Sequence, residues 1–151
     1  MKMVDTKSKE RKKLAVVLVR GKAELEHHMI RTLQLLLLTK KNHCVVVENT
    51  PVYQGMLQKV KDYVTWGEIS EETFAELIAK RGKEYKNPIY DAKKKYTYTV
   101  LEVKGKKYLP YFTLNPPRKG FARKGIKVSF TQGGALGYRG SKINDLLARM
   151  I

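Results

Sequence analysis

Residues 42–69 read NHCVVVENTPVYQGMLQKVKDYVTWGEI, and this stretch decides the fold because it contains a strand, a helix and a second strand. His43 to Glu48 is a short apolar run rich in valine, which is typical of a buried strand. Thr50 then supplies an oxygen that can cap a helix, and Pro51 suits the first helical position. The apolar helical face comprises Met56, Leu57, Val60, Tyr63 and Val64, and the second strand runs from Thr65 to Ile69.

The residues before this stretch repeat the same arrangement. Leu14 to Arg20 is a valine-rich run that predicts a strand buried on both faces. Ala23 to Leu38 carries apolar residues every three or four positions, which predicts a helix. The order β-α-β-α-β predicts an α/β (α+β) fold in which two helices cover one face of a small three-stranded sheet, and the other face stays available. If the first two strands are parallel, the crossover between them is right-handed.

Regular structure is predicted to become sparser after the core. Residues 70–82 predict a third helix, with Ser70 as its cap and two acids favouring the positive end of its dipole. Tyr96 to Val103 has the composition of a strand, which the next residues, up to Tyr108, turn into a hairpin. Two prolines, Pro116 and Pro117, then end regular structure.

The C-terminal part predicts a basic glycine-rich arm followed by a short helix. Residues 118–142 contain six glycines, which favours a long extended loop or a loose hairpin. The helical spacing beyond them predicts a terminal helix that docks back on the core, with Ser141 as its cap. The apolar residues of that helix are Ile143, Leu146, Leu147 and Met150.

The net charge of +17 is concentrated in parts of the chain. Residues 14–79 carry seven bases and eight acids, whereas residues 118–142 carry seven bases and no acid. Residues 80–107 carry ten bases and three acids. Such clusters predict a polyanionic partner. They divide the chain into a basic tail (1–13), a core (14–83) and a basic extension (84–151) that includes the arm and the terminal helix.

The acid-free arm is the main candidate for RNA binding. Its bases alternate with Phe121, Phe130 and Tyr138, so charge that binds phosphate is combined with rings that stack on unpaired bases. An isolated basic run is usually solvated surface, but the complete absence of acids favours RNA here. The predicted RNA-binding residues are Arg11, Lys12, Lys13, Arg20, Lys59, Arg118, Lys119, Gly120, Phe121, Arg123, Lys124, Lys127, Tyr138, Arg139 and Lys142.

The sequence predicts no enzyme, metal or cofactor. Residues 133–137 are glycine-rich but lack the Lys-Ser/Thr ending of a P-loop, so turn-forming glycines explain them better. His27 and His28 are neighbours on a helix, and His43 and Cys44 are neighbours on a strand, so neither pair converges on one ion. The acids gather where helix termini explain them, and no nucleophile has an evident base.

Other features predict a protein of a reducing compartment. Cys44, the only cysteine, lies in an apolar run, which predicts a buried core residue and fits a cytoplasmic location. The longest aliphatic run, Leu35 to Leu38, is far shorter than a membrane span, and no signal-peptide cleavage pattern follows the lysine-rich start. Trp66, Tyr53 and Tyr63 are interpreted as packing residues.

Six strings occur in one register along the chain: Asn42–Val47, Thr50–Asp62, Val64–Ile69, Leu114–Phe121, Gly133–Gly140 and Lys142–Leu147. Together they resemble the archaeal-type large-subunit ribosomal protein of the universal L-thirty family, whose eukaryotic counterpart is called L-seven. The resemblance covers roughly residues 14–83 and 112–151. It implies a ferredoxin-like core and a non-enzymatic role in the large ribosomal subunit, in assembly and translation. The implied partners are large-subunit ribosomal RNA, near the 5S RNA, and neighbouring ribosomal proteins, with no membrane and no small-molecule substrate.

Three residues depart from the family pattern. Gln54 stands where an arginine is common, Asn115 where a histidine is, and Lys119 where a second glycine is.

Two other functions are alternatives to the ribosomal one. A ferredoxin-like regulatory domain requires an apolar ligand pocket, and a DNA-packaging protein binds duplex DNA as tightly as ribosomal RNA.

Overall fold

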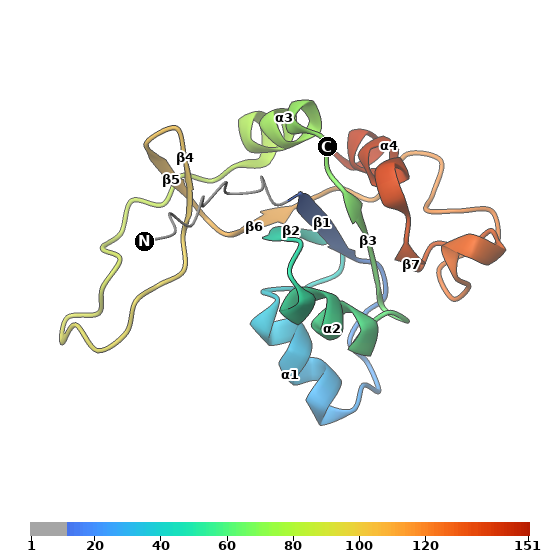
Figure 1. The fold of residues 1–151 in the computed structure, drawn as a ribbon, viewed down its shortest axis with the longest axis horizontal. Helices are drawn as coiled ribbons and strands as arrows, with labels where there is room; N and C mark the ends of the chain where they lie inside the picture. Colours follow the sequence, from blue (N-terminus) through green and yellow to red (C-terminus); the bar gives the residue numbers. More distant parts are fainter. Residues whose placement is uncertain (1–11) are drawn as a thin grey trace, which may run out of the picture.

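The computed structural model describes residues 12–151, and a five-stranded sheet in the order β6-β2-β1-β3-β7 lies at its centre (Figure 1). The central strand is β1 (Lys13–Leu18), which pairs antiparallel with both β2 (His43–Glu48) and β3 (Val64–Glu68). These three strands confirm the predicted β-α-β-α-β core. The predicted number of three strands is wrong, because β6 (Tyr111–Thr113) and β7 (Gly137–Tyr138) extend the sheet at its edges. Strands this short leave no periodicity in a sequence.

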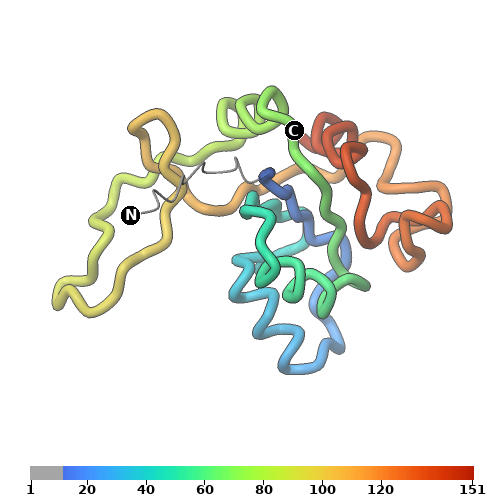
Figure 2. The backbone as a smooth tube through the Cα atoms, viewed as in Figure 1, coloured from blue at the N-terminus to red at the C-terminus, as the bar shows by residue number. Residues whose placement is uncertain are grey.

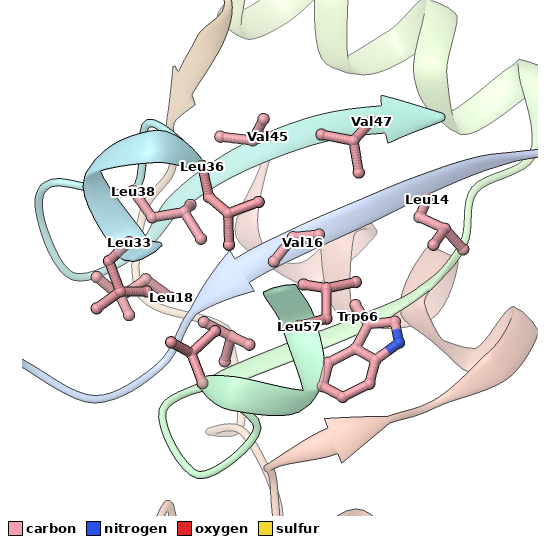
Figure 3. Packing of buried hydrophobic residues seen from close by; sticks show 12 residues of the cluster. Leu14, Val16, Leu18, Leu33, Leu36, Leu38, Val45, Val47, Leu57 and Trp66 are labelled. Carbon is pink, nitrogen blue, oxygen red and sulfur yellow. The ribbon is translucent and has the colours of Figure 1, made fainter. Parts of the chain in front are cut away.

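Helices α1 (His27–Leu35) and α2 (Pro51–Lys59) cover one face of the sheet, as predicted (Figure 3). The condition for a right-handed first crossover is not met, because β1 and β2 are antiparallel. It is β2 and β3 that run in the same direction, on either side of β1. The buried residues of this layer are Leu14, Val16, Leu18, Leu33, Leu36, Leu38, Val45, Val47, Leu57, Val60, Val64 and Trp66.

Helix α1 is shorter than the sequence predicted. It begins only at His27, because the preceding residues form a turn in which Glu24 has a φ of 62°. At its other end Leu37, with a φ of 62°, donates its N–H to the carbonyl of Gln34, and Leu38 donates to that of Leu33. This pair of bonds is a Schellman cap, which turns the chain away while Leu38 stays in the core.

The second face of the sheet is also covered, contrary to the prediction that it stays available. Helix α3 (Glu71–Arg81) and helix α4 (Ile143–Met150) pack there against the β1 side chains Ala15 and Val17. The valine-rich sequence of β1 requires this second layer, because a strand with apolar residues on both faces is stable only when both are covered. The sheet is therefore enclosed between two pairs of helices.

The helix caps agree only in part with the predictions. The Ser70 hydroxyl accepts the N–H of Thr73 at 3.3 Å, which confirms the cap of α3. The predicted cap of α4 by Ser141 is wrong, because this helix continues directly from the 3₁₀ turn η2 (Gly140–Lys142) and has no side-chain cap.

A hairpin formed by β4 (Leu101–Val103) and β5 (Lys106–Tyr108) confirms the predicted hairpin, but its first strand begins at Leu101 and not at Tyr96. Lys104 and Gly105 join the strands with φ values of 49° and 77°, the left-handed geometry that tight hairpin turns require. Residues 84–100, here called the finger, extend from the base of this hairpin and project away from the sheet (Figure 2, yellow-green to yellow).

His43 and Cys44, the two potential metal ligands of strand β2, lie on opposite faces of the sheet, as predicted. Cys44 packs with α3 and α4, and its burial raises the pKa of the thiol to about 12. His43 lies on the opposite face and stacks on Tyr111, with ring centroids 5.3 Å apart. Within residues 12–151, none of the helices has the length and apolar character needed to cross a bilayer.

Candidate RNA-binding interface

Residues 118–142, here called the basic loop, fold back onto the edge of the sheet. Strand β7 pairs in parallel with β3, placing Gly137 beside Thr65. Ala135 and Leu136 are buried against Val19, just beyond the end of β1. The predicted extended arm is thus a compact loop, because its few apolar residues find a cover at the sheet edge.

Arg139 is the residue around which the basic loop is built. Its side chain is only 7% exposed, and Nε donates to the Thr65 hydroxyl at 2.8 Å. Nη2 donates to the carbonyls of Ala135 at 3.0 Å and Phe121 at 3.4 Å. Burial lowers the pKa of Arg139 to about 10, with a further contribution from Arg149. The guanidinium thus has a structural role in holding the loop, beside the predicted contact of Arg139 with RNA phosphate.

A second arginine, Arg149, fastens the start of the loop to helix α4. Its Nη1 donates to the carbonyl of Gly120 at 2.6 Å and to that of Arg118 at 3.1 Å. Between these residues the chain turns through left-handed conformations, with φ values of 63° at Lys119 and 75° at Gly120. This role of Arg149 was not predictable, because nothing in the helical pattern distinguishes it from a solvated base.

The remaining bases of the loop point outward from this fixed frame. Five bases between residues 118 and 127, and Lys142 near the end of the loop, are exposed. The stem of Lys124 lies beside Gly133, and Lys142 lies 5.5 Å from the centre of the Phe130 ring. Phe121 instead packs against the core clusters, so its ring is mainly structural. The outward bases are Arg118, Lys119, Arg123, Lys124, Lys127 and Lys142.

Tyr138 is the exposed aromatic ring of the loop. It is 52% exposed and leans on Trp66, with ring centroids 6.5 Å apart. Both rings line a cavity of about 590 Å³ at the N-terminal end of α2, together with the amides of Asn49, Gln54 and Gln58. Gln54 donates to Asn49 at 2.6 Å, so the residue that departs from the family pattern is held by a neighbour.

The other predicted residues lie at the two ends of β1 and at the end of α2. Arg20 follows β1 next to Val19, and its guanidinium lies 4.9 Å from the centre of the Tyr63 ring. Lys59 is exposed at the end of α2. Lys12 and Lys13 lie at the start of β1, the opposite end from Arg20, and Arg11 lies outside the described residues. The structure therefore places Arg20 near the basic loop and leaves Lys12 and Lys13 apart from it.

A second cavity lies at the start of β1. It has a volume of about 680 Å³ and is lined by Lys12, Lys13, Glu68 and Glu71 among others. Both cavities combine charged or amide side chains with apolar ones, among them Trp66 in the first and Phe74 in the second, so their linings do not decide against the pocket that the regulatory-domain hypothesis requires. No cluster of three or more His, Cys, Asp or Glu side chains that could hold a metal ion occurs in residues 12–151.

Comparison with known proteins identifies the family. Residues 14–64 match the family model described as ribosomal protein L30p/L7e. A protein of Methanopyrus kandleri named large ribosomal subunit protein uL30 is 42% identical over 149 residues, which cover 88% of this chain and all of the relative. Proteins with the same name from Methanococcus maripaludis and Nanoarchaeum equitans are also 42% identical, over 91% of this chain and 98% and 97% of their own lengths. The chain therefore belongs to the ribosomal protein L30p/L7e family.

Proposed function

We propose that this protein is a non-enzymatic constituent of the large ribosomal subunit in the cytoplasm, where it binds ribosomal RNA and supports subunit assembly and translation. Its family membership supports the place in the subunit. The observation that supports RNA binding is the basic loop, in which six exposed bases without an acid project from a backbone held by Arg139 and Arg149. Preorganised cations lose little conformational freedom when they meet phosphates.

The proposed contact surface comprises the outward bases of the loop, the ring of Tyr138 and the nearby Arg20, together with Lys59 at the end of α2. Lys12 and Lys13 form a separate contact at the other end of β1, and Arg11, which lies outside the described residues, is included on its sequence alone. The proposed partners are large-subunit ribosomal RNA, including the neighbourhood of the 5S RNA, and adjacent ribosomal proteins.

Sedimentation of a cell extract through a high-salt sucrose gradient tests the place of the protein. Co-migration of the chain with the large subunit is expected. Recovery of the chain only among free proteins at the top would reject the proposal.

Paired charge variants test the surface. Arg123→Gln/Lys124→Gln removes two cations from the basic loop, and Lys40→Gln/Lys41→Gln removes two exposed cations from the turn between α1 and β2. The loop variant is expected to weaken binding to ribosomal RNA and to reduce the slope of log affinity against log salt by about 2. The turn variant should change neither quantity. Equal losses in the two variants, or equal affinity for duplex DNA and ribosomal RNA, would reject a specific RNA surface on the loop.

A further inference from the structure

The finger lies at the opposite end of the molecule from the basic loop. Figures 1 and 2 show the finger projecting from one end of the long axis and the basic loop at the other. The base of the finger is held by two backbone hydrogen bonds. The N–H of Tyr85 donates to the carbonyl of Lys107 at 2.8 Å, and the N–H of Leu109 donates to the carbonyl of Lys83 at 2.9 Å. The tip makes no comparable contact with the sheet, so packing of the core does not explain its composition.

The backbone of the finger forms a short antiparallel ladder closed by a turn. Tyr98 donates its N–H to the carbonyl of Ile89 at 2.8 Å, and Asp91 donates to that of Tyr96 at 3.1 Å. Tyr90 lies opposite Thr97 between these bonds. Side chains alternate along such a ladder, so Tyr96 and Tyr98 share one face, while Tyr90 lies on the other.

The two tyrosines on the shared face are largely solvent-exposed. Tyr96 is 69% exposed and Tyr98 is 50% exposed, although aromatic rings bury more apolar area than most side chains. Residues two apart in a strand are separated by about 6.6 Å along the chain. This is roughly twice the 3.4 Å spacing of stacked bases, so one flat base fits between two rings at this separation.

The turn beside these rings carries three consecutive lysines, Lys93, Lys94 and Lys95. All three are exposed, and none forms an ion pair with a residue that the structure describes. The nearest acid along the chain, Asp91, is engaged in the turn, where its carboxylate accepts the N–H of Ala92 at 2.8 Å. Phosphate-binding charge therefore lies directly next to two exposed rings.

We propose that the finger is a second RNA-binding site, which takes an unpaired nucleotide: Tyr96 and Tyr98 stack on its base and Lys93 to Lys95 bind the flanking phosphates. Duplex RNA does not offer a free base face, so the ligand is a single-stranded loop, bulge or end. The choice of RNA as the polyanion rests on the proposed function. A protein partner is disfavoured by the three exposed lysines, because charge is depleted at the centres of protein interfaces.

Binding of the full-length chain to labelled oligouridine, and to a blunt-ended RNA duplex of equal charge, tests this site. Tyr96→Leu/Tyr98→Leu is expected to lower oligouridine affinity by about 10-fold or more and duplex affinity by less than about twofold. Tyr96→Phe/Tyr98→Phe keeps both rings and should restore the affinity. Tyr90→Leu, on the opposite face of the same ladder, is the matched control and should have little effect.

The salt dependence separates stacking from charge. Lys93→Gln/Lys94→Gln/Lys95→Gln should reduce the salt slope for oligouridine by about 2, whereas the leucine pair should leave the slope unchanged. An unchanged oligouridine affinity in the leucine pair, or an equal loss in Tyr90→Leu, would overturn the assignment. Circular dichroism of each variant confirms that the chain is folded.

Ultraviolet crosslinking on assembled large subunits tests the site in its natural setting. Nucleotide adducts on Tyr96 or Tyr98 are expected, and crosslinks from these residues to protein alone would overturn the proposal. The two proposals fail in different ways. If only the finger is wrong, the leucine pair binds normally while Arg123→Gln/Lys124→Gln still weakens RNA binding. If the ribosomal function is wrong, the unmodified chain does not sediment with the subunit.

Discussion

Arg139 Nε donates a hydrogen bond of 2.8 Å to the hydroxyl of Thr65, and that hydroxyl in turn donates to the carbonyl of Gly137 at 2.9 Å. The bond links residues 74 positions apart and joins the basic loop to strand β3. A guanidinium that the sequence predicts to contact RNA is therefore part of the frame that holds the basic loop.

Replacement of Arg139 should destabilise the fold. Arg139→Met leaves the carbonyl of Ala135 and the Thr65 hydroxyl without their donor, at an expected cost of roughly 2–3 kcal/mol in the free energy of unfolding. Urea unfolding measures this cost, and the exposed Arg123→Met should stay within about 0.5 kcal/mol of the unmodified protein. Arg139→Met should also weaken RNA binding without changing the salt slope. A slope reduced by about 1 would instead mean that Arg139 contacts phosphate.

Two glycines should respond in opposite ways to the same substitution. A Cβ at Gly67 would collide with the carbonyl oxygen of Gly140 and lie 2.9 Å from Ile143 Cβ, so Gly67→Ala is expected to cost about 2–3 kcal/mol. A Cβ at Gly55 in helix α2 meets nothing within 4 Å, so Gly55→Ala should stabilise by about 0.5–1 kcal/mol. Thermal unfolding of both variants checks the pair. Equal shifts in the same direction would contradict the close approach of β3 to η2.

A glycine at position 119 should stabilise the turn at the start of the basic loop. Lys119 has a φ of 63°, a conformation that costs a residue with a side chain roughly 1–2 kcal/mol. Lys119→Gly should therefore raise the free energy of unfolding by about 0.5–1 kcal/mol after the extra flexibility of the unfolded chain is counted. Gly120→Ala, with a φ of 75° and open space around its Cβ, should lower it by about 1 kcal/mol. Chemical denaturation that gives both variants the same sign would contradict the observed backbone.

The stability of the protein should fall as the pH drops below about 6.5. Burial lowers the pKa of His43 from 6.5, and Lys40, Lys22 and Lys83 lower it further. Below pH 6.5 the unfolded chain takes up a proton that the folded protein binds less readily, so protonation favours unfolding. The loss should level off once the pH is below the folded pKa. His43→Phe keeps a ring against Tyr111 and should remove this part of the pH dependence, measured by urea unfolding between pH 5 and 8. An identical pH profile in the variant would refute the assignment to His43.

The β-α-β-α-β core from β1 to β3 could be predicted from the sequence because its signals are local. The valine run predicts β1, and Thr50-Pro51 predicts the start of α2, each from a few neighbouring residues. The docking of α4 on the core was predicted, but the sheet face that it covers and the edge strands β6 and β7 were not, because they depend on contacts between residues far apart in the chain.

The candidate site was predictable in composition but not in geometry. The acid-free run located the basic loop, whereas the burial of Arg139 and the clamp made by Arg149 follow from tertiary contacts. The exposed tyrosines of the finger were equally hidden, because the sequence alone does not reveal which rings the core leaves uncovered.

The second helical layer has a consequence for the order in which the protein matures. The first layer is encoded in one continuous stretch, from β1 to β3, so it can form early during synthesis. The other side of β1 must wait for α4, whose Met150 is completely buried. Until the turn of α4 that contains Met150 has been synthesised, the second face of the nascent sheet exposes apolar side chains and is most vulnerable to aggregation. Shielding by a chaperone therefore matters most in that interval, before the protein can take its place in a ribosome.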